Sequence, residues 1–448
     1  MRSAISAAAA ALVVLLAAAG GAVPAFAQDE GYSDEEMFGG GTGLVTETSE
    51  AAASGAGAAS GIGAAGSLLK SETVKIGGAF YMTLEGTGDP DEWGSDPLRY
   101  LAPSAVLRTD LYADARPDED FRVFVKGGLE YPEEGNADLK LKEAFADLVP
   151  VDGVFVRAGR QTANWGVGWF FSPANLLDLA TVDPEDPEAE LPGPLAIKVQ
   201  VPTGADNYYA YALLDDAAEG GPAALAPKAE WVIGSAEVAL GGIWSASDPW
   251  AAMATYSGAV GDLDLFAEAV LRGNGDKRFV VADASAPLGL SVETRADELY
   301  PQATFGFGWA WDEEEGRLGV SLRAQYYYNG LGYEDSSILS ENSAKVGALL
   351  QSGALAPDDL VQRDRHYGAA NLAFSDILGS DAGASLFWIG NLADASGRTK
   401  ATVSWAGLDH VIPSVAWTWS YGRKGSEFAP AGAGSSVSLL ITVTQGTF

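Results

Sequence analysis

The chain has 448 residues, with 61 Asp and Glu against 27 Lys and Arg, and its formal net charge is −34. So acidic a chain would be repelled by the phosphate backbone, which argues against nucleic-acid binding. Because the sequence contains no cysteine, neither a disulfide framework nor a lipid-modified N-terminal cysteine is possible.

Residues 1–27 have the features of a secretory signal peptide. Arg2 gives a basic start, residues 7–23 contain only Ala, Leu, Val and Gly, and residues 25–27 supply an A-x-A cleavage pattern. A transmembrane helix is the alternative, but the segment lacks a basic stop-transfer cluster. We therefore expect cleavage before Gln28 and export of the chain.

Residues 28–72 are acidic at first and then rich in Gly, Ala and Ser. Such a composition does not bury enough apolar surface to offset the entropy lost on ordering. We expect a flexible periplasmic segment, and a short plug or partner-docking segment is the alternative.

From residue 73 onward, apolar and polar residues alternate with the period of two that is typical of β-strands. In residues 121–131, for example, Val123 and Val125 share one face, while Arg122 and Lys126 share the other. Many runs end in Trp or Tyr, as expected at the two interfaces of a membrane. The predicted strands are 73–85, 99–114, 121–131, 138–149, 153–161, 194–202, 207–215, 226–233, 236–246, 249–260, 263–273, 300–311, 317–329, 363–374, 381–392, 398–407, 411–422 and 435–446.

The predicted connections alternate between long and short. Outer-membrane barrels have short periplasmic turns and long extracellular loops. No stretch after Val23 is apolar for long enough to form a spanning helix, and in lipid only a closed barrel otherwise satisfies the backbone. The sequence therefore predicts an all-β transmembrane antiparallel up-and-down β-barrel over residues 73–448, with about 18 strands and 16 as the alternative. The long connections are 86–98, 162–193, 216–225, 274–299, 330–362 and 423–434, all odd-numbered in chain order.

Basic side chains are dense on the predicted inner face of the early strands. A Lys or Arg that faced lipid at the bilayer midplane would cost about 2–4 kcal/mol, so a water-filled lumen is the cheaper place for these charges. We expect them to line the pore, either as a basic wall that acts on solutes or as charges that pair with Asp110, Asp114 and Glu143. The basic wall consists of Arg108, Arg122, Lys126, Lys140, Lys142 and Arg157.

The segment 155–173 contains a distinctive motif. Gly159, Arg160 and Gln161 are followed after three residues by Trp165 and Gly166, and then by Pro173. This arrangement resembles the GRQ-xxx-WG pattern of large bacterial outer-membrane porins, including the alginate-export-like and related uncharacterised porin families. In general porins the third outward loop folds into the lumen and forms the constriction, and the resemblance implies the same here.

The third outward connection in this chain is 162–193, which is aromatic at first and acidic later. If it enters the lumen opposite the basic wall, a transverse field would orient polar solutes there. The alternative is that this loop only caps the barrel from outside. Its acidic residues are Asp178, Asp183, Glu185, Asp186, Glu188 and Glu190.

The chain ends in Phe448 after an alternating strand, which resembles the signal through which the barrel-assembly machinery recognises outer-membrane barrels. The match departs from the usual pattern, because Val437, Leu439 and Ile441 fall on the opposite parity to Phe448. A bulge near Gly446 would restore the register.

No catalytic constellation is present, because His366 and His410 lie in no metal-spaced or triad-like pattern. We expect no enzyme activity, metal or cofactor, with a carboxylate-only hydrolase as the rival from another class.

The sequence predicts a porin-like channel in the bacterial outer membrane for passive diffusion of small hydrophilic solutes. A substrate-specific outer-membrane transporter and a structural or adhesin barrel are the alternatives. The expected partners are outer-membrane lipid, the assembly machinery and the solutes.

Overall fold

The computed structural model describes residues 74–88, 102–118, 120–132, 137–177, 184–185, 192–218, 220–245, 249–273, 275–312 and 317–445. All of them belong to one compact unit of the chain, 50–448. The predicted signal peptide, the predicted segment 28–72 and Phe448 lie outside the described residues.

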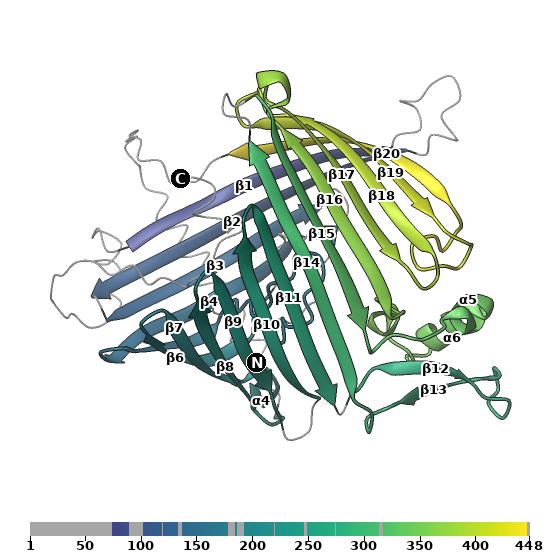
Figure 1. Cartoon of the computed structure of the whole chain (residues 1–448), viewed down its shortest axis with the longest axis horizontal. Helices are drawn as coiled ribbons and strands as arrows, with labels where there is room; N and C mark the ends of the chain where they lie inside the picture. Colours follow the sequence, from purple (N-terminus) through teal and green to yellow (C-terminus); the bar gives the residue numbers. More distant parts are fainter. Residues whose placement is uncertain are drawn as a thin grey trace. The chain divides into compact units, whose positions relative to one another are not determined.

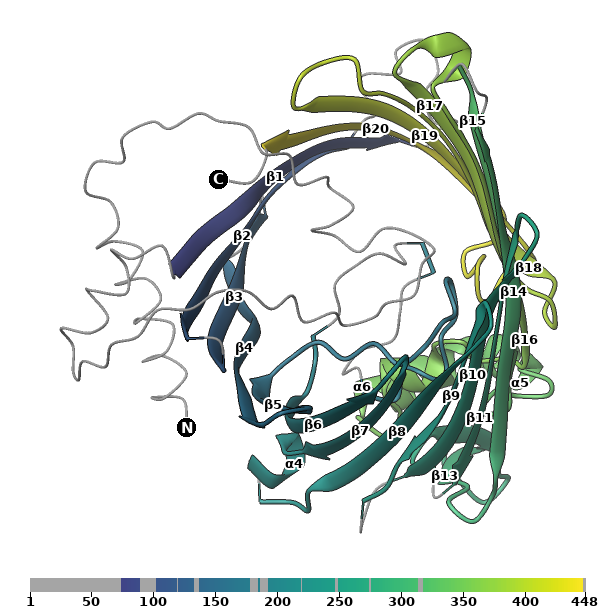
Figure 2. The ribbon, with the colours of Figure 1, turned by 60° about the vertical axis from the view of Figure 1, so that its left-hand side comes forward.

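Eighteen strands form one antiparallel sheet that closes on itself (Figures 1 and 2). Each strand pairs with the next along the chain, and β1 pairs with β20 to complete the ring. The predicted β-barrel is thus confirmed, and each predicted strand has its counterpart with ends that differ by a few residues. The strands are β1 (Val74–Gly88), β2 (Ala102–Asp118), β3 (Phe121–Pro132), β4 (Asp138–Val151), β5 (Val154–Arg160), β6 (Leu195–Thr203), β7 (Asp206–Leu213), β8 (Ala224–Ile233), β9 (Ala236–Ile243), β10 (Trp250–Val260), β11 (Leu263–Gly273), β14 (Tyr300–Asp312), β15 (Gly319–Asn329), β16 (His366–Ser375), β17 (Ala382–Asn391), β18 (Ser396–Trp405), β19 (Val411–Tyr421) and β20 (Gly434–Gln445).

The two faces of the sheet differ in chemistry, because successive side chains of a strand point to opposite sides. The outer face exposes large apolar side chains around the ring, whereas the inner face carries the charged and hydroxyl side chains. An outer face of this kind suits a hydrocarbon environment. Outer-face residues include Phe80, Leu107, Leu129, Ile197, Leu240, Phe305, Leu386, Val403, Trp417 and Leu439.

One irregularity changes which residues of β4 face the lumen. Lys126 of β3 lies opposite Glu143, while the next residue, Gly127, lies opposite Leu141, so Lys142 is the extra residue of a β-bulge. As a result, Lys142 and Glu143 both turn inward. Strict alternation would have placed one of them on the outer face.

The odd-numbered connections gather at one rim of the barrel and the short even-numbered turns at the other, as the alternating lengths predict. Two of the long connections build a small substructure beyond their rim (Figure 1). A separate two-stranded sheet, β12 (Arg278–Ala282) and β13 (Leu290–Thr294), packs with helices α5 (Ser337–Glu341) and α6 (Ser343–Gln351) around an apolar core. The period-two pattern does not indicate these short elements.

The short helix α4 (Asp215–Ala218) lies in the connection between β7 and β8, and two 3-10 turns occupy Pro357–Leu360 and Ile377–Gly379. Among the residues that the structure describes, no helix is long and apolar enough to cross a membrane.

The face assignment predicts opposite outcomes for two adjacent substitutions in β3. Val125→Asp places a charge on the outer face and should destabilise a membrane-inserted barrel by on the order of 2 kcal/mol or block assembly. Lys126→Asp should assemble normally, because that side chain faces the lumen. Heat-modifiable mobility of the assembled barrel measures both. Equal assembly of the two variants would show that the alternation does not define a lipid-facing wall.

The rim assignment is tested by single thiols, since the native chain has no cysteine. Gly347→Cys in α6 lies in open space at the long-loop rim and should react with a membrane-impermeant maleimide on intact cells. Ser235→Cys, in the exposed β8–β9 turn, should react only after the cells are broken. The reverse pattern would invert the topology.

Candidate functional site: the lumen

The first half of the third outward connection lies against the inner wall of the barrel. Trp165, Ala174 and Leu177 pack with inner-face residues of β7, β10 and β11 in one buried apolar cluster. Phe170 and Phe171 pack with inner-face residues of β15, β16 and β17 in a second. Segment 161–177 therefore runs inside the lumen across much of its circumference, rather than capping the barrel from outside.

The GRQ part of the motif forms the root of this loop. Gly159 has a φ of 136°, and a Cβ there would collide with the backbone of Ala144 on β4. Gln161 is buried, and its amide donates a hydrogen bond to the carbonyl oxygen of Ala196. Arg160 lies at the rim, where its guanidinium binds the carboxylate of Asp215 at 3.1 Å.

The later motif residues continue the anchoring. The Trp165 ring packs edge-on against Tyr211 with centroids 5.6 Å apart. A Cβ on Gly166 would collide with the Ser172 hydroxyl, so glycine lets the two parts of the loop approach each other closely here. The carbonyl oxygen of Pro173 accepts a hydrogen bond from Arg272 on β11. The motif residues thus hold the loop against the wall. Their spacing matches the positions at which the loop contacts the neighbouring strands or folds back on itself.

The loop divides the lumen into two unlike halves. On β6–β17, polar inner-face side chains beneath the loop are buried: Thr255 is 4 % exposed, Glu268 3 % and Gln325 5 %. On β18–β20 and β1–β5, most inner-face side chains keep partial access to water. We call these the covered wall and the open wall. Uncharged residues of the open wall include Thr83, Tyr112, Thr402, Thr418 and Ser436.

The open wall contains the predicted basic residues, and the structure places them in ion pairs. Arg122 binds Asp114 through two nitrogens at 2.9 and 3.2 Å. Arg157 binds Asp147 at 2.6 Å, and Lys142 binds Asp110 at 2.8 Å. Pairing with Asp110 and Asp114 is one of the two expectations from sequence, whereas Asp147 becomes identifiable only from the strand register.

Two of the remaining basic residues form ion pairs as well, and Lys126 has a glutamate as its cross-strand neighbour. The Arg108 Nε atom lies 3.3 Å from a carboxylate oxygen of Glu130, and the Lys140 Nζ atom lies 3.2 Å from one of Asp138. The side chains of both pairs are exposed. Lys126 and Glu143 are cross-strand partners, and the Glu143 carboxylate also accepts the backbone N–H of Thr162 at the loop root.

Aromatic rings support the central guanidinium groups. Tyr112, Phe124 and Phe145 stack in a row across β2–β4, with centroids 6.0 and 5.2 Å apart. The Arg157 guanidinium carbon lies 4.0 Å from the Phe145 ring centroid, and that of Arg122 lies 5.1 Å from the Phe124 centroid. Cation–π contact together with a bidentate carboxylate fixes each guanidinium in one orientation.

Among the predicted acidic loop residues, Glu185 is the one that the structure describes; Asp178, Asp183, Asp186, Glu188 and Glu190 lie outside the described residues. Glu185 forms an ion pair with Arg398 on the inner face of β18. The described acid therefore meets a basic residue of the open wall, although on a strand that the sequence analysis did not single out.

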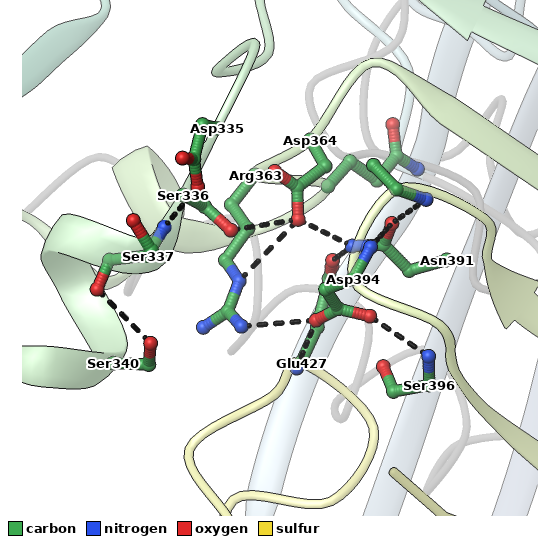
Figure 3. A network of polar contacts seen from close by, with 12 residues as sticks. Asp335, Ser336, Ser337, Ser340, Arg363, Asp364, Asn391, Asp394, Ser396 and Glu427 are labelled. Carbon is green, nitrogen blue, oxygen red and sulfur yellow. Dashed lines mark hydrogen bonds and ion pairs between the residues drawn. The ribbon is translucent and has the colours of Figure 1, made fainter. Parts of the chain in front are cut away.

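A polar network links three connections at the long-loop rim (Figure 3). One oxygen of the buried Asp364 accepts hydrogen bonds from Ser336 at 2.8 Å and from the Asn391 amide at 2.6 Å. The same amide nitrogen donates to Glu427 at 2.8 Å, and Arg363 binds Asp394 at 3.0 Å. The network joins the β15–β16, β17–β18 and β19–β20 connections at the mouth of the barrel.

Burial raises the pKa of the Glu427 carboxyl above its ordinary value, and the nearby Asp364 carboxylate raises it as well. Hydrogen bonds from Tyr367 and Asn391 and the charge of Arg363 oppose this shift. The protonated form of Glu427 is therefore more favoured than for a glutamate in water.

No group of three or more metal-ligating side chains occurs in the described part of the chain. The His366 Nδ1 atom lies 2.7 Å from the Tyr326 hydroxyl on the outer face, and His410 lies in the β18–β19 turn with a φ of 61°. Neither histidine faces the lumen.

No protein-family model matches the sequence, and no curated protein matches it. Among solved structures, OccAB1 of Acinetobacter baumannii is 12 % identical with a TM-score of 0.47, over 84 % of this chain and 97 % of that one. The outer membrane protein OpdK of Pseudomonas aeruginosa is 9 % identical with a TM-score of 0.47, over 84 % and 99 %. A variant of the Rhodopseudomonas blastica porin is 10 % identical with a TM-score of 0.41, over 83 % and 100 %. Likenesses this distant leave the function to be argued from the residues of this chain.

The division into two walls predicts different reactivity for two threonines that both face inward. Thr418→Cys on β19 should react quickly with a small charged thiol reagent, because the open wall is wet. Thr255→Cys on β10 should be protected, because that position is buried on the covered wall. Labelling rates measured by mass spectrometry on the assembled barrel compare the access of water to the two positions. Similar rates at the two positions would rule out the division.

Proposed function

We propose that the chain is a porin-like channel of the bacterial outer membrane that lets small hydrophilic solutes diffuse passively. The observation that carries this proposal is the open wall: a closed barrel with an apolar outer face keeps a strip of water-accessible charges and hydroxyls along its inner face. The signal-peptide pattern of residues 1–27 supports export. The terminal Phe448 supports delivery to the barrel-assembly machinery.

The physical basis of passage is exchange of hydrogen bonds. A hydrated solute gives up part of its water shell to enter a narrow pore, and hydroxyls such as Thr402 and Thr418 replace those bonds without holding the solute tightly. The ion pairs of the open wall supply polar groups while remaining nearly neutral as a set. Nothing in this mechanism requires a reaction or a cofactor.

We further propose that the acidic half of the loop makes the pore electrostatically asymmetric. Residues 178–190 carry several carboxylates, and Glu185 reaches Arg398 on the open wall. A solute that passes between the loop and the wall lies within about a Debye length of both, roughly 8 Å at physiological salt. We propose that this field orients polar solutes in the narrowest part of the pore.

Conductance in planar bilayers tests the proposal most directly. The native protein should form open, ohmic channels. If the acidic half of the loop narrows the lumen as proposed, deletion of Thr181–Glu190 should raise single-channel conductance. A barrel that conducts no ions would support a structural or adhesin role. Saturable conductance that one solute blocks would support a substrate-specific transporter.

Reversal potentials under a salt gradient test the charge assignment separately. Neutralising Asp183, Glu185, Asp186 and Glu188 together should shift selectivity toward anions, most strongly at low salt. The double variant Arg122→Gln and Arg157→Gln should shift it toward cations, since it removes two positive charges from the open wall and takes from Asp147 both of its arginine partners, while Asp114 keeps only Arg116. Unchanged selectivity in both variants would place the pathway elsewhere.

A further inference from the structure

Glu268 on β11 is a buried carboxylate that binds the loop at several points. It is 3 % exposed and faces the lumen between Asp264 and Arg272 on the same face of the strand. Its Oε1 atom accepts the backbone N–H groups of Val167 and Gly168, both at 2.6 Å. The same oxygen accepts the Ser172 hydroxyl at 2.9 Å, and Oε2 accepts the backbone N–H of Ala174 at 2.8 Å.

Gln325 on β15 holds the middle of the same segment. Its Oε1 atom accepts the backbone N–H groups of Phe170 at 2.6 Å and Phe171 at 3.3 Å, while its amide nitrogen donates to the Phe171 carbonyl oxygen. Segment 167–174 forms neither helix nor strand. Two side chains of the covered wall therefore supply the acceptors that secondary structure would otherwise supply.

The loop sequence leaves room for this contact. A Cβ on Gly166 would lie 2.8 Å from the Glu268 Oε1 atom, and a Cβ on Gly168 would lie 2.9 Å from the Gln325 amide nitrogen. Both distances are shorter than a carbon atom tolerates. The nearest contacts of both Cβ positions are within the loop, with the Ser172 hydroxyl and the Phe171 carbonyl oxygen, so glycine serves the fold of the loop as well as its close approach to the wall.

We propose that Glu268, assisted by Gln325, is the positioning residue that holds the loop against the covered wall and thereby sets the width of the pore. The consequence for pore width rests on the proposed channel function, whereas the contact itself does not. A carboxylate is suited to this role because both of its oxygens only accept hydrogen bonds, and at least four donors of the loop converge on them. Removing it leaves those donors buried without acceptors, so the segment leaves the wall.

Substitutions of graded severity follow from the geometry. Glu268→Gln keeps the volume but replaces one oxygen with an NH2 group, which then faces loop N–H groups. Glu268→Ala removes all four acceptor contacts. Asp264→Asn is the matched control, because it removes one negative charge from the same face of the same strand, and Asp264 makes no hydrogen bond to segment 161–177. Gly168→Ala changes the loop and leaves every wall residue in place, since the added Cβ would meet the Phe171 carbonyl oxygen and the Gln325 amide nitrogen.

The experiment combines a thiol probe with conductance. Ala174→Cys places a single thiol where the native residue is fully buried, and it should be protected from a small charged reagent. Adding Glu268→Ala or Glu268→Gln should speed its labelling by on the order of tenfold or more, whereas adding Asp264→Asn should not. Single-channel conductance in bilayers should change in the two Glu268 variants and in Gly168→Ala. It should stay the same in Asp264→Asn. Far-UV circular dichroism and heat-modifiable mobility confirm that each barrel has assembled.

Each outcome decides a distinct point. If the thiol stays protected in both assembled Glu268 variants, Glu268 does not hold the loop and the inference fails. If the thiol becomes reactive but conductance is unchanged, the loop moves without setting the pore width, which also overturns the inference. If the native protein never conducts while Glu268 still controls the thiol, the proposed channel function fails and the positioning role stands.

Discussion

The structure depends on closure of the sheet between β1 and β20. Once the ring is closed, every strand has a neighbour on each side, and the strands satisfy one another's backbone groups. The side chains are then free to divide by chemistry, with apolar residues outside and polar residues inside. A ring of 18 strands also encloses more space than its own inner side chains fill, so the lumen needs a further element to narrow it. Segment 161–177 supplies that element.

The backbone N–H and C=O groups of an irregular segment inside a barrel have no partners from helix or strand pairing. Its backbone groups leave water when the loop packs on the wall, and they need acceptors there. Glu268 and Gln325 meet this need on one side of the lumen, while the clusters around Trp165 and Phe171 remove water from the same side. The opposite side keeps its water, and this is why the open wall lies on β18–β20 and β1–β5. The asymmetry of the lumen thus follows from where one loop finds its partners.

Sequence reasoning recovers the strands because their signal is local. The period of two is visible within ten residues, and it assigned Val125 and Lys126 to their faces without any knowledge of neighbouring strands. Register is a property of two strands, so the β4 bulge and the Arg157–Asp147 pair are not visible in the sequence. The small sheet β12–β13 was missed for another reason: its strands have five residues each, too few for a periodic pattern.

Contacts between distant residues are also what sequence reasoning misses in the lumen. Trp165 and Gly166 stood out because they form a motif, although their role as loop anchors required the partners Tyr211 and Ser172. Glu268 gave no signal, since it lies in an alternating strand like Asp264 and contacts residues about a hundred positions earlier in the chain. Polar residues at inner positions of a barrel are ordinary, and only a structure separates one that meets water from one that meets a loop.

The ion pairs of the open wall bear on how such a pore selects solutes. A wall of unpaired basic residues would repel cations and hold anions, which slows their release. When Arg122, Arg157 and Lys142 each have a carboxylate beside them, their fields largely cancel beyond a few ångströms, and a passing ion responds to the small excess that remains. The wall then remains polar enough to replace water yet binds no ion strongly, which is the condition for fast passage. If the acidic half of the loop lies along the pathway as proposed, its carboxylates, which have no Lys or Arg among them in residues 162–193, govern selectivity more than the basic residues that are most conspicuous in the sequence.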